Sequence, residues 1–114
     1  MNSDLLAVTH ILDSARHIQA YVEGVNWEDF RLDIQLQDAV LRRLEIIGEA
    51  SGRISVAYRE ANPMIRWKDM IGMRNRVIHA YDDIDVEIVW ETVQRDIPLL
   101  ATQLEAILPT GLES

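Results

Sequence analysis

The chain has 114 residues, with 19 acidic and 11 basic side chains, a formal net charge of −8, and no cysteine. Its length predicts one domain over residues 1–114, and the lack of cysteine excludes disulfides, thiolate zinc sites and a cysteine nucleophile. No apolar run approaches the roughly 18 residues of a membrane span, and the N-terminus lacks the basic region of a signal peptide, so we expect a cytoplasmic protein.

The first element predicted along the chain is a helix from about Asp4 to Glu23. Its apolar side chains recur at the three- and four-residue spacing of an amphipathic helix. Ser3 is the expected N-cap, and Gly24 is the expected stop. A short turn should follow around residues 26–30, with Asn26 as a candidate cap for the next element.

A second helix is expected from roughly Asp33 to Ile54. Gly48 and Gly52 lie four residues apart inside it, and each costs up to about 1 kcal/mol of helix propensity. Such glycines indicate either a close crossing with another helix or an early helix end.

A third helix is predicted to start at Asn62–Pro63, read as a cap and a first-turn proline, and to reach Ile78. Acidic residues at 82, 83 and 85 should then supply the cap of a last helix that ends at Leu108 and is kinked by Pro98. Strand-like alternation is absent. The sequence therefore predicts an all-α fold, an antiparallel helical bundle of four main helices plus short turns.

The charge is unevenly distributed along the chain. Residues 82–114 hold Arg95 as their one basic residue against eight acids. Residues 66–76 reverse the sign, with four basic side chains against Asp69. Those four are Arg66, Lys68, Arg74 and Arg76. The net charge opposes unspecific nucleic-acid binding, whereas this local cluster is suited to a phosphate.

Residues 74–81 hold the densest group of chemically capable side chains. Asn75 and His79 share a helix face, whereas Arg74 lies about 140° from His79, so a second copy meeting at a two-fold axis would bring both pairs together. A histidine base and a phosphate-binding arginine fit metal-independent cleavage of RNA. Residue types alone favour a plainer interpretation, in which Arg74 pairs with Asp69 or Asp82 at the surface and His79 and Tyr81 fill a helix end.

The order of motifs around this segment resembles the HepT family of toxins, in the HEPN superfamily. Arg74, His79 and Tyr81 match its Arg-x4-His-x-Tyr signature. The further matches are residues 46–50 (Ile-Ile-Gly-Glu-Ala), 63–67, 71, 74–75, 84–85 and 89–90, and the likeness covers roughly residues 4–104.

The resemblance implies a homodimeric helical bundle that cleaves RNA without metal or cofactor. By this likeness Arg74 binds and stabilises the scissile phosphate, His79 is the acid or base, and Asn75 supports them. Contacts to the RNA backbone are expected from Arg66, Lys68 and Arg76. The implied partner is the family's nucleotidyltransferase antitoxin, MntA, which would transfer AMP to Tyr81.

The sequence also allows other functions and other roles for single residues. A non-catalytic HEPN module that binds a nucleotide or scaffolds a nucleotidyltransferase is the alternative function. His10, Asp13 and His17 lie on one helix face at a spacing compatible with a metal, although an exposed face is the expected interpretation. Trp27, Trp67 and Trp90 are expected in the core rather than stacked on bases.

Overall fold

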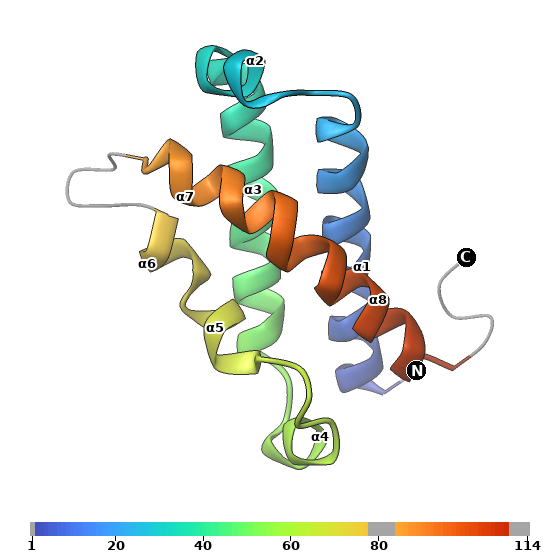
Figure 1. Cartoon of the computed structure of the whole chain (residues 1–114). Coiled ribbons are helices and arrows are strands. Elements are labelled where there is room, and N and C mark those ends of the chain that lie inside the picture. The colour runs from blue at the N-terminus through green and yellow to red at the C-terminus, as the bar shows by residue number, and fades with distance from the viewer. Residues whose placement is uncertain (1, 78–83, 110–114) are drawn as a thin grey trace.

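The computed structural model describes residues 2–77 and 84–109, except the side chain of Arg74. These residues form helices joined by short connections, without a β-strand (Figure 1). The elements are α1 (Ser3–Val22), α2 (Trp27–Leu32), α3 (Ile34–Gly52), α4 (Val56–Ala61), α5 (Trp67–Ile71), α6 (Met73–Val77), α7 (Val86–Glu91), the π-helical turn η2 (Thr92–Asp96) and α8 (Ile97–Ile107). The all-α prediction is confirmed.

Two long helices, α1 and α3, lie side by side and form the centre of the molecule (Figure 1). The continuous run of α7, η2 and α8 crosses them diagonally, while α5 and α6 pack against α3. Ile11 on α1, Leu44 on α3 and Ile97 on α8 are fully buried between these layers. None of the helices in the described ranges is long and apolar enough to cross a membrane.

Polar side chains fix the helix starts at the N-terminal end of the chain. The side chain of Asn2 caps α1 by accepting a hydrogen bond from the Leu5 amide at 2.8 Å, so the expected cap at Ser3 is wrong by one residue. Gly24 has the left-handed φ of 75° that ends a helix without steric strain. Asn26 caps the next element as expected, but this element is the helix α2 rather than a turn.

The two glycines of α3 have different roles. A Cβ built on Gly48 would lie 3.2 Å from the carbonyl oxygen of Met70, which shows that α5 crosses α3 at this position. Gly52 has no neighbour within 4 Å and is the last residue of α3. The close crossing and the helix end that the sequence offered as alternatives are therefore both present, one at each glycine.

The third predicted helix starts later than expected. The backbone N–H of Asn62 donates to the Arg59 carbonyl at 3.1 Å, so Asn62 ends α4. The sequence did not predict this helix. Pro63 follows that end, as prolines often do, instead of opening the next helix. The next helix begins at Trp67, whose indole N–H donates to the Asn62 carbonyl at 3.0 Å. It divides at Gly72 into α5 and α6.

The last predicted helix is continuous but changes its winding. Asp85 caps α7 by accepting from the Ile88 amide at 3.1 Å, as the acidic run predicted. Between α7 and α8 the chain makes a π-helical turn, closed by a hydrogen bond from the Ile97 amide to the Thr92 carbonyl. Pro98 lies just after this turn and donates no backbone hydrogen bond. The irregularity that the structure shows is this widened turn before Pro98, and the kink predicted at Pro98 stays a prediction.

Candidate functional site

The short helix α6 carries the start of the signature sequence. Met73 and Val77 point into the core with exposed fractions of 2% and 0%, and this orientation directs Asn75 outward to solvent. Arg74 lies in α6, and only its backbone is described. His79 and Tyr81 lie outside the described residues. Their predicted roles, and that of Arg74, remain predictions.

The ends of the segment that contains His79 and Tyr81 are joined by the backbone. The Asp85 amide donates to the Val77 carbonyl at 2.8 Å. This bond places the start of α7 next to the end of α6, in agreement with their positions in Figure 1. Val77 and Asp85, which lie on either side of residues 78–83 in the sequence, are therefore neighbours in the fold.

Arg76 ties α6 to the π-helical turn. Its guanidinium donates to the hydroxyl of Thr92 and to a carboxylate oxygen of Asp96, each at 3.0 Å. Thr92 is buried, and its own hydroxyl hydrogen is donated to the Ile88 carbonyl at 2.8 Å. The tie holds the helix that carries Arg74 in one position relative to η2. It also shows that Arg76, predicted as an RNA contact, has partners within the protein.

A groove of about 440 Å³ opens between α5–α6 on one side and η2–α8 on the other. We call it the Arg groove because three guanidiniums line it, those of Arg66, Arg76 and Arg95. Asp69 and Asp96 are the carboxylates of its lining. Its remaining surface is mostly apolar, provided by Met64, Met70, Met73, Leu99 and Leu100.

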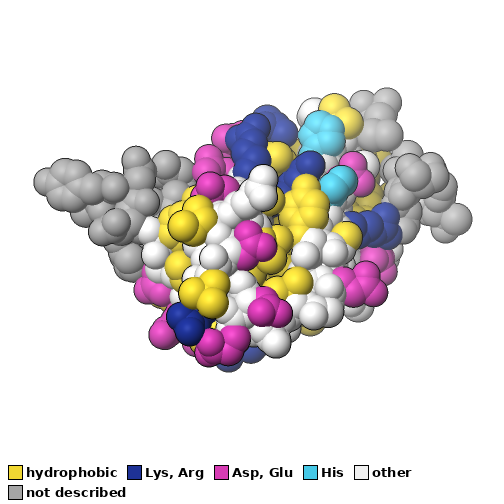
Figure 2. Space-filling view, turned by 90° about the horizontal axis from the view of Figure 1, so that it is seen from above, with side chains coloured by type: hydrophobic (Ala, Val, Ile, Leu, Met, Phe, Trp, Pro, Cys, Tyr) yellow, Lys and Arg dark blue, Asp and Glu magenta, His cyan; other side chains and the backbone are white. Residues whose placement is uncertain are grey.

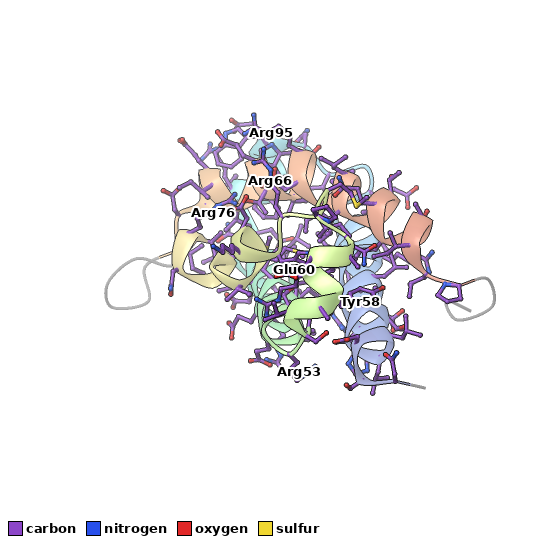
Figure 3. The ribbon with its side chains drawn as sticks, turned by 90° about the horizontal axis from the view of Figure 1, so that it is seen from below. Arg53, Tyr58, Glu60, Arg66, Arg76 and Arg95 are labelled. Carbon is purple, nitrogen blue, oxygen red and sulfur yellow. The ribbon has the colours of Figure 1, made fainter. Side chains whose placement is uncertain are left out.

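The three arginines come from segments far apart in the sequence but lie on one side of the molecule, away from Arg53 (Figure 3). Arg66 precedes α5 and its side chain is 86% exposed. Lys68 is exposed on α5 but is not part of the groove lining. Of the predicted backbone contacts, the structure therefore brings Arg66 and Arg76 together and leaves Lys68 apart.

Arg95 is a member of the groove that the sequence analysis did not single out as a site residue. It projects from η2, and its side chain is 77% exposed. In the sequence, the one feature that distinguishes Arg95 is its charge, since it is the one basic residue after residue 81. The charge marks it as unusual, but only the fold places η2 across the groove from α5 and so connects Arg95 with Arg66.

The remaining sequence candidates belong to the scaffold. His17 uses Nδ1 in a 2.7 Å hydrogen bond with the Asp13 carbonyl of its own helix. No group of three or more metal-ligating side chains is found within the described ranges. Trp67 is buried as expected, and Trp90 packs on Phe30 with ring centroids 4.9 Å apart. On the face seen from above, acidic side chains are scattered among hydrophobic ones (Figure 2).

Fold and site define a helical domain in which an arginine-lined groove lies beside the helix that carries the start of an Arg-x4-His-x-Tyr sequence. The family model described as ribonuclease HepT-like matches residues 11–107 of this chain. The chain therefore belongs to the HepT-like family of the HEPN superfamily, and the resemblance drawn from its motifs is confirmed.

Relatives of known name support this assignment over most of the chain. It is 40% identical to a protein of Thermococcus cleftensis described as a candidate ribonuclease HepT, over 85% of this chain and 88% of that protein. It is 39% identical to a candidate RNase of Caldanaerobacter subterraneus, over 87% and 88% of the two chains. A candidate RNase of Methanocaldococcus jannaschii is 37% identical, over 85% and 89%. No solved structure matches the chain significantly.

Proposed function

We propose that the protein is a metal-independent endoribonuclease toxin of the HepT/MntA type that acts in the cytoplasm. The relatives named as ribonucleases support the reaction class. The observation that carries the proposal is the position of the Arg groove. It concentrates three guanidiniums beside α6, the helix of Arg74, in a chain of net charge −8.

The proposed reaction uses the RNA's own 2′-hydroxyl as nucleophile. His79 accepts the proton of that hydroxyl, and the oxygen attacks the adjacent phosphorus. Arg74 binds the phosphate oxygens with its planar fork and stabilises the charge that develops on them. The bond to the 5′-oxygen breaks and this oxygen takes up a proton from water, leaving a 2′,3′-cyclic phosphate and a 5′-hydroxyl. Asn75, exposed on the same helix, would orient the imidazole or contact RNA.

The active unit in this proposal is a homodimer. Arg74 and His79 are five residues apart and point about 140° from each other on a regular helix, so one helix does not aim both at a single phosphate. Two copies meeting at a two-fold axis bring the Arg74 of each into reach of one shared cleft. Arg66, Lys68 and Arg76 would then hold the RNA backbone on either side of the cut.

The proposed control is covalent. A nucleotidyltransferase antitoxin of the MntA type would transfer AMP from ATP to the phenolic oxygen of Tyr81 and release pyrophosphate. The added phosphate carries negative charge two residues from His79, where it would pair with Arg74 and repel an incoming RNA phosphate. One modification thereby switches off a small cationic cleft.

The test is cleavage of RNA by the purified chain in EDTA, compared with Arg74→Ala and His79→Ala. We expect cleavage by the native chain, with ends that carry a cyclic phosphate, and loss of activity in both variants. Equal background in all three would contradict the enzyme and favour the non-catalytic binding module.

Co-expression with the antitoxin tests the control. Intact mass should rise by one or more AMP groups in the native chain, and Tyr81→Phe should stay unmodified and active. AMP found on another residue of the Tyr81→Phe chain, with equal neutralisation, would overturn the assignment of Tyr81.

A further inference from the structure

The walls of the Arg groove present guanidiniums from opposite sides. Arg66 belongs to the α5 side and Arg95 to the η2 side, whereas Arg76 is fixed between α6 and η2 by Thr92 and Asp96. In Figure 3 all three lie in the same upper part of the view, away from Arg53. A ligand in the groove would therefore meet positive charge on both of its sides.

The two outer arginines are free to exchange their partners. Arg66 lies 3.6 Å from Asp69, and Arg95 lies 3.7 Å from Glu91, with the arginine side chains 86% and 77% exposed. Exposed pairs with such long contacts contribute little to stability. A phosphate offers each guanidinium a shorter, bidentate and charge-assisted contact in their place.

Apart from Asp69, Asp96 and Gln103, the groove between the arginines is apolar. Met64 and Leu99, one from each side, are 57% and 59% exposed, and Met70 and Met73 lie beneath with their side chains buried. The volume of about 440 Å³ falls in the range of small-ligand pockets. A flat apolar group that carries a phosphate fits this combination, because a nucleobase can lie on aliphatic side chains and on guanidinium planes.

We propose that the Arg groove binds one unpaired nucleotide of the RNA substrate, next to the scissile phosphate. Arg66 and Arg95 hold its phosphate, and Met64 and Leu99 contact its base. A base in a duplex is stacked and paired, so the groove selects single-stranded segments. This assignment rests on the proposed ribonuclease function and adds Arg95, Met64 and Leu99 to its substrate site.

The test separates RNA binding from RNA cleavage. Binding of a short unpaired oligoribonucleotide and of its duplex is measured by fluorescence anisotropy on the His79→Ala chain, which leaves the RNA intact. The His79→Ala chain is then combined with Arg95→Ala or with Leu99→Ala. The control is Arg53→Ala, which removes the same charge as Arg95→Ala from an exposed position away from the groove.

We expect the unpaired strand to bind better than the duplex. Arg95→Ala should weaken its binding about tenfold and lower the salt dependence by about one phosphate contact. Leu99→Ala should weaken binding several-fold without changing the salt dependence, and Arg53→Ala should match the background. Circular dichroism checks that each variant is folded.

The outcomes distinguish this proposal from the proposed function. Loss of binding in Arg95→Ala and Leu99→Ala supports the groove even if the native chain cleaves no RNA. Cleavage by the native chain combined with unchanged binding in both variants overturns it. Sedimentation that shows a dimer for the native chain and a monomer for Leu99→Ala also overturns it, because the groove would then be covered by a second copy.

Discussion

Two parts of this molecule are built differently. At its centre α1 and α3 are long and regular, with 20 and 19 residues, and their inner faces are apolar. In the other part α5, α6 and η2 have five residues each, and a polar tie from Arg76 joins α6 to η2. The regular pair is a scaffold stabilised by apolar burial. The broken side presents cations and backbone irregularities, and it carries the candidate site.

The contrast has a local cause. Where Gly48 lets α5 approach α3, the crossing helix is short and ends at Gly72. Where Pro98 supplies no backbone donor, the preceding turn widens into η2. These departures from regular helix set Arg66, Arg76 and Arg95 around one groove.

The largest effect is expected from truncating the scaffold. Leu44 is fully buried on α3, so Leu44→Ala should lower the free energy of unfolding by about 2–5 kcal/mol. The same substitution at Leu99, which is 59% exposed beside the groove, should cost less than about 1 kcal/mol. Urea denaturation measures both values, and equal losses would contradict the division between scaffold and site.

A smaller effect is expected where scaffold and site meet. Gly48→Val would force side-chain atoms against the Met70 carbonyl, which is 3.2 Å from an added Cβ. We expect a loss of about 1–3 kcal/mol from this overpacking, seen as a lower denaturation midpoint. Gly52→Val is the matched control, since nothing lies within 4 Å of that position. An equal denaturation midpoint for Gly48→Val and Gly52→Val would show that α5 does not depend on this close approach.

The hydrogen bonds of Arg76 to Thr92 and Asp96 should contribute less to stability than the close approach at Gly48, and more to activity. Thr92→Val keeps the buried shape but removes the hydroxyl that Arg76 contacts, so we expect a loss of about 1 kcal/mol. Amide hydrogen exchange in α6 should speed up, and kcat for RNA cleavage should fall more than KM rises, because Arg74 is less well positioned. Unchanged exchange in α6 would show that the tie does not hold this helix.

The smallest effect concerns Asp4, far from the groove. Its carboxylate accepts from the hydroxyl and the amide of Ser55 at 2.7 and 2.8 Å, and these bonds lower its pKa. A lowered pKa stabilises the fold above the unfolded-state value, about 3.9, and this stabilisation is lost as the pH falls through the folded-state value.

Asp4→Asn should therefore flatten the acid limb of the stability profile below about pH 4. Asp13→Asn, on the exposed face of the same helix, controls for the removal of one carboxylate. Denaturation at a series of pH values measures the difference, and an acid limb identical to that of the native chain would rule out this contribution of Asp4.

Sequence reasoning reached the scaffold and only part of the site. Apolar spacing placed α1 and α3 within one or two residues of their observed bounds, because a long buried face leaves a regular pattern. The same pattern hid the break at Gly72 and the start at Trp67, since each depends on which helix the segment meets. Arg95 was visible as an isolated charge, but its place in one groove with Arg66 depends on where the fold sets η2 relative to α5.

The central claim, that RNA binds the broken side and not the α1–α3 scaffold, is tested most directly by photocrosslinking. The His79→Ala chain is irradiated with an unpaired RNA containing 4-thiouridine, and the modified peptides are mapped by mass spectrometry. We predict crosslinks in residues 64–76 and 95–103. Crosslinks confined to the outer faces of α1 and α3 would contradict the account.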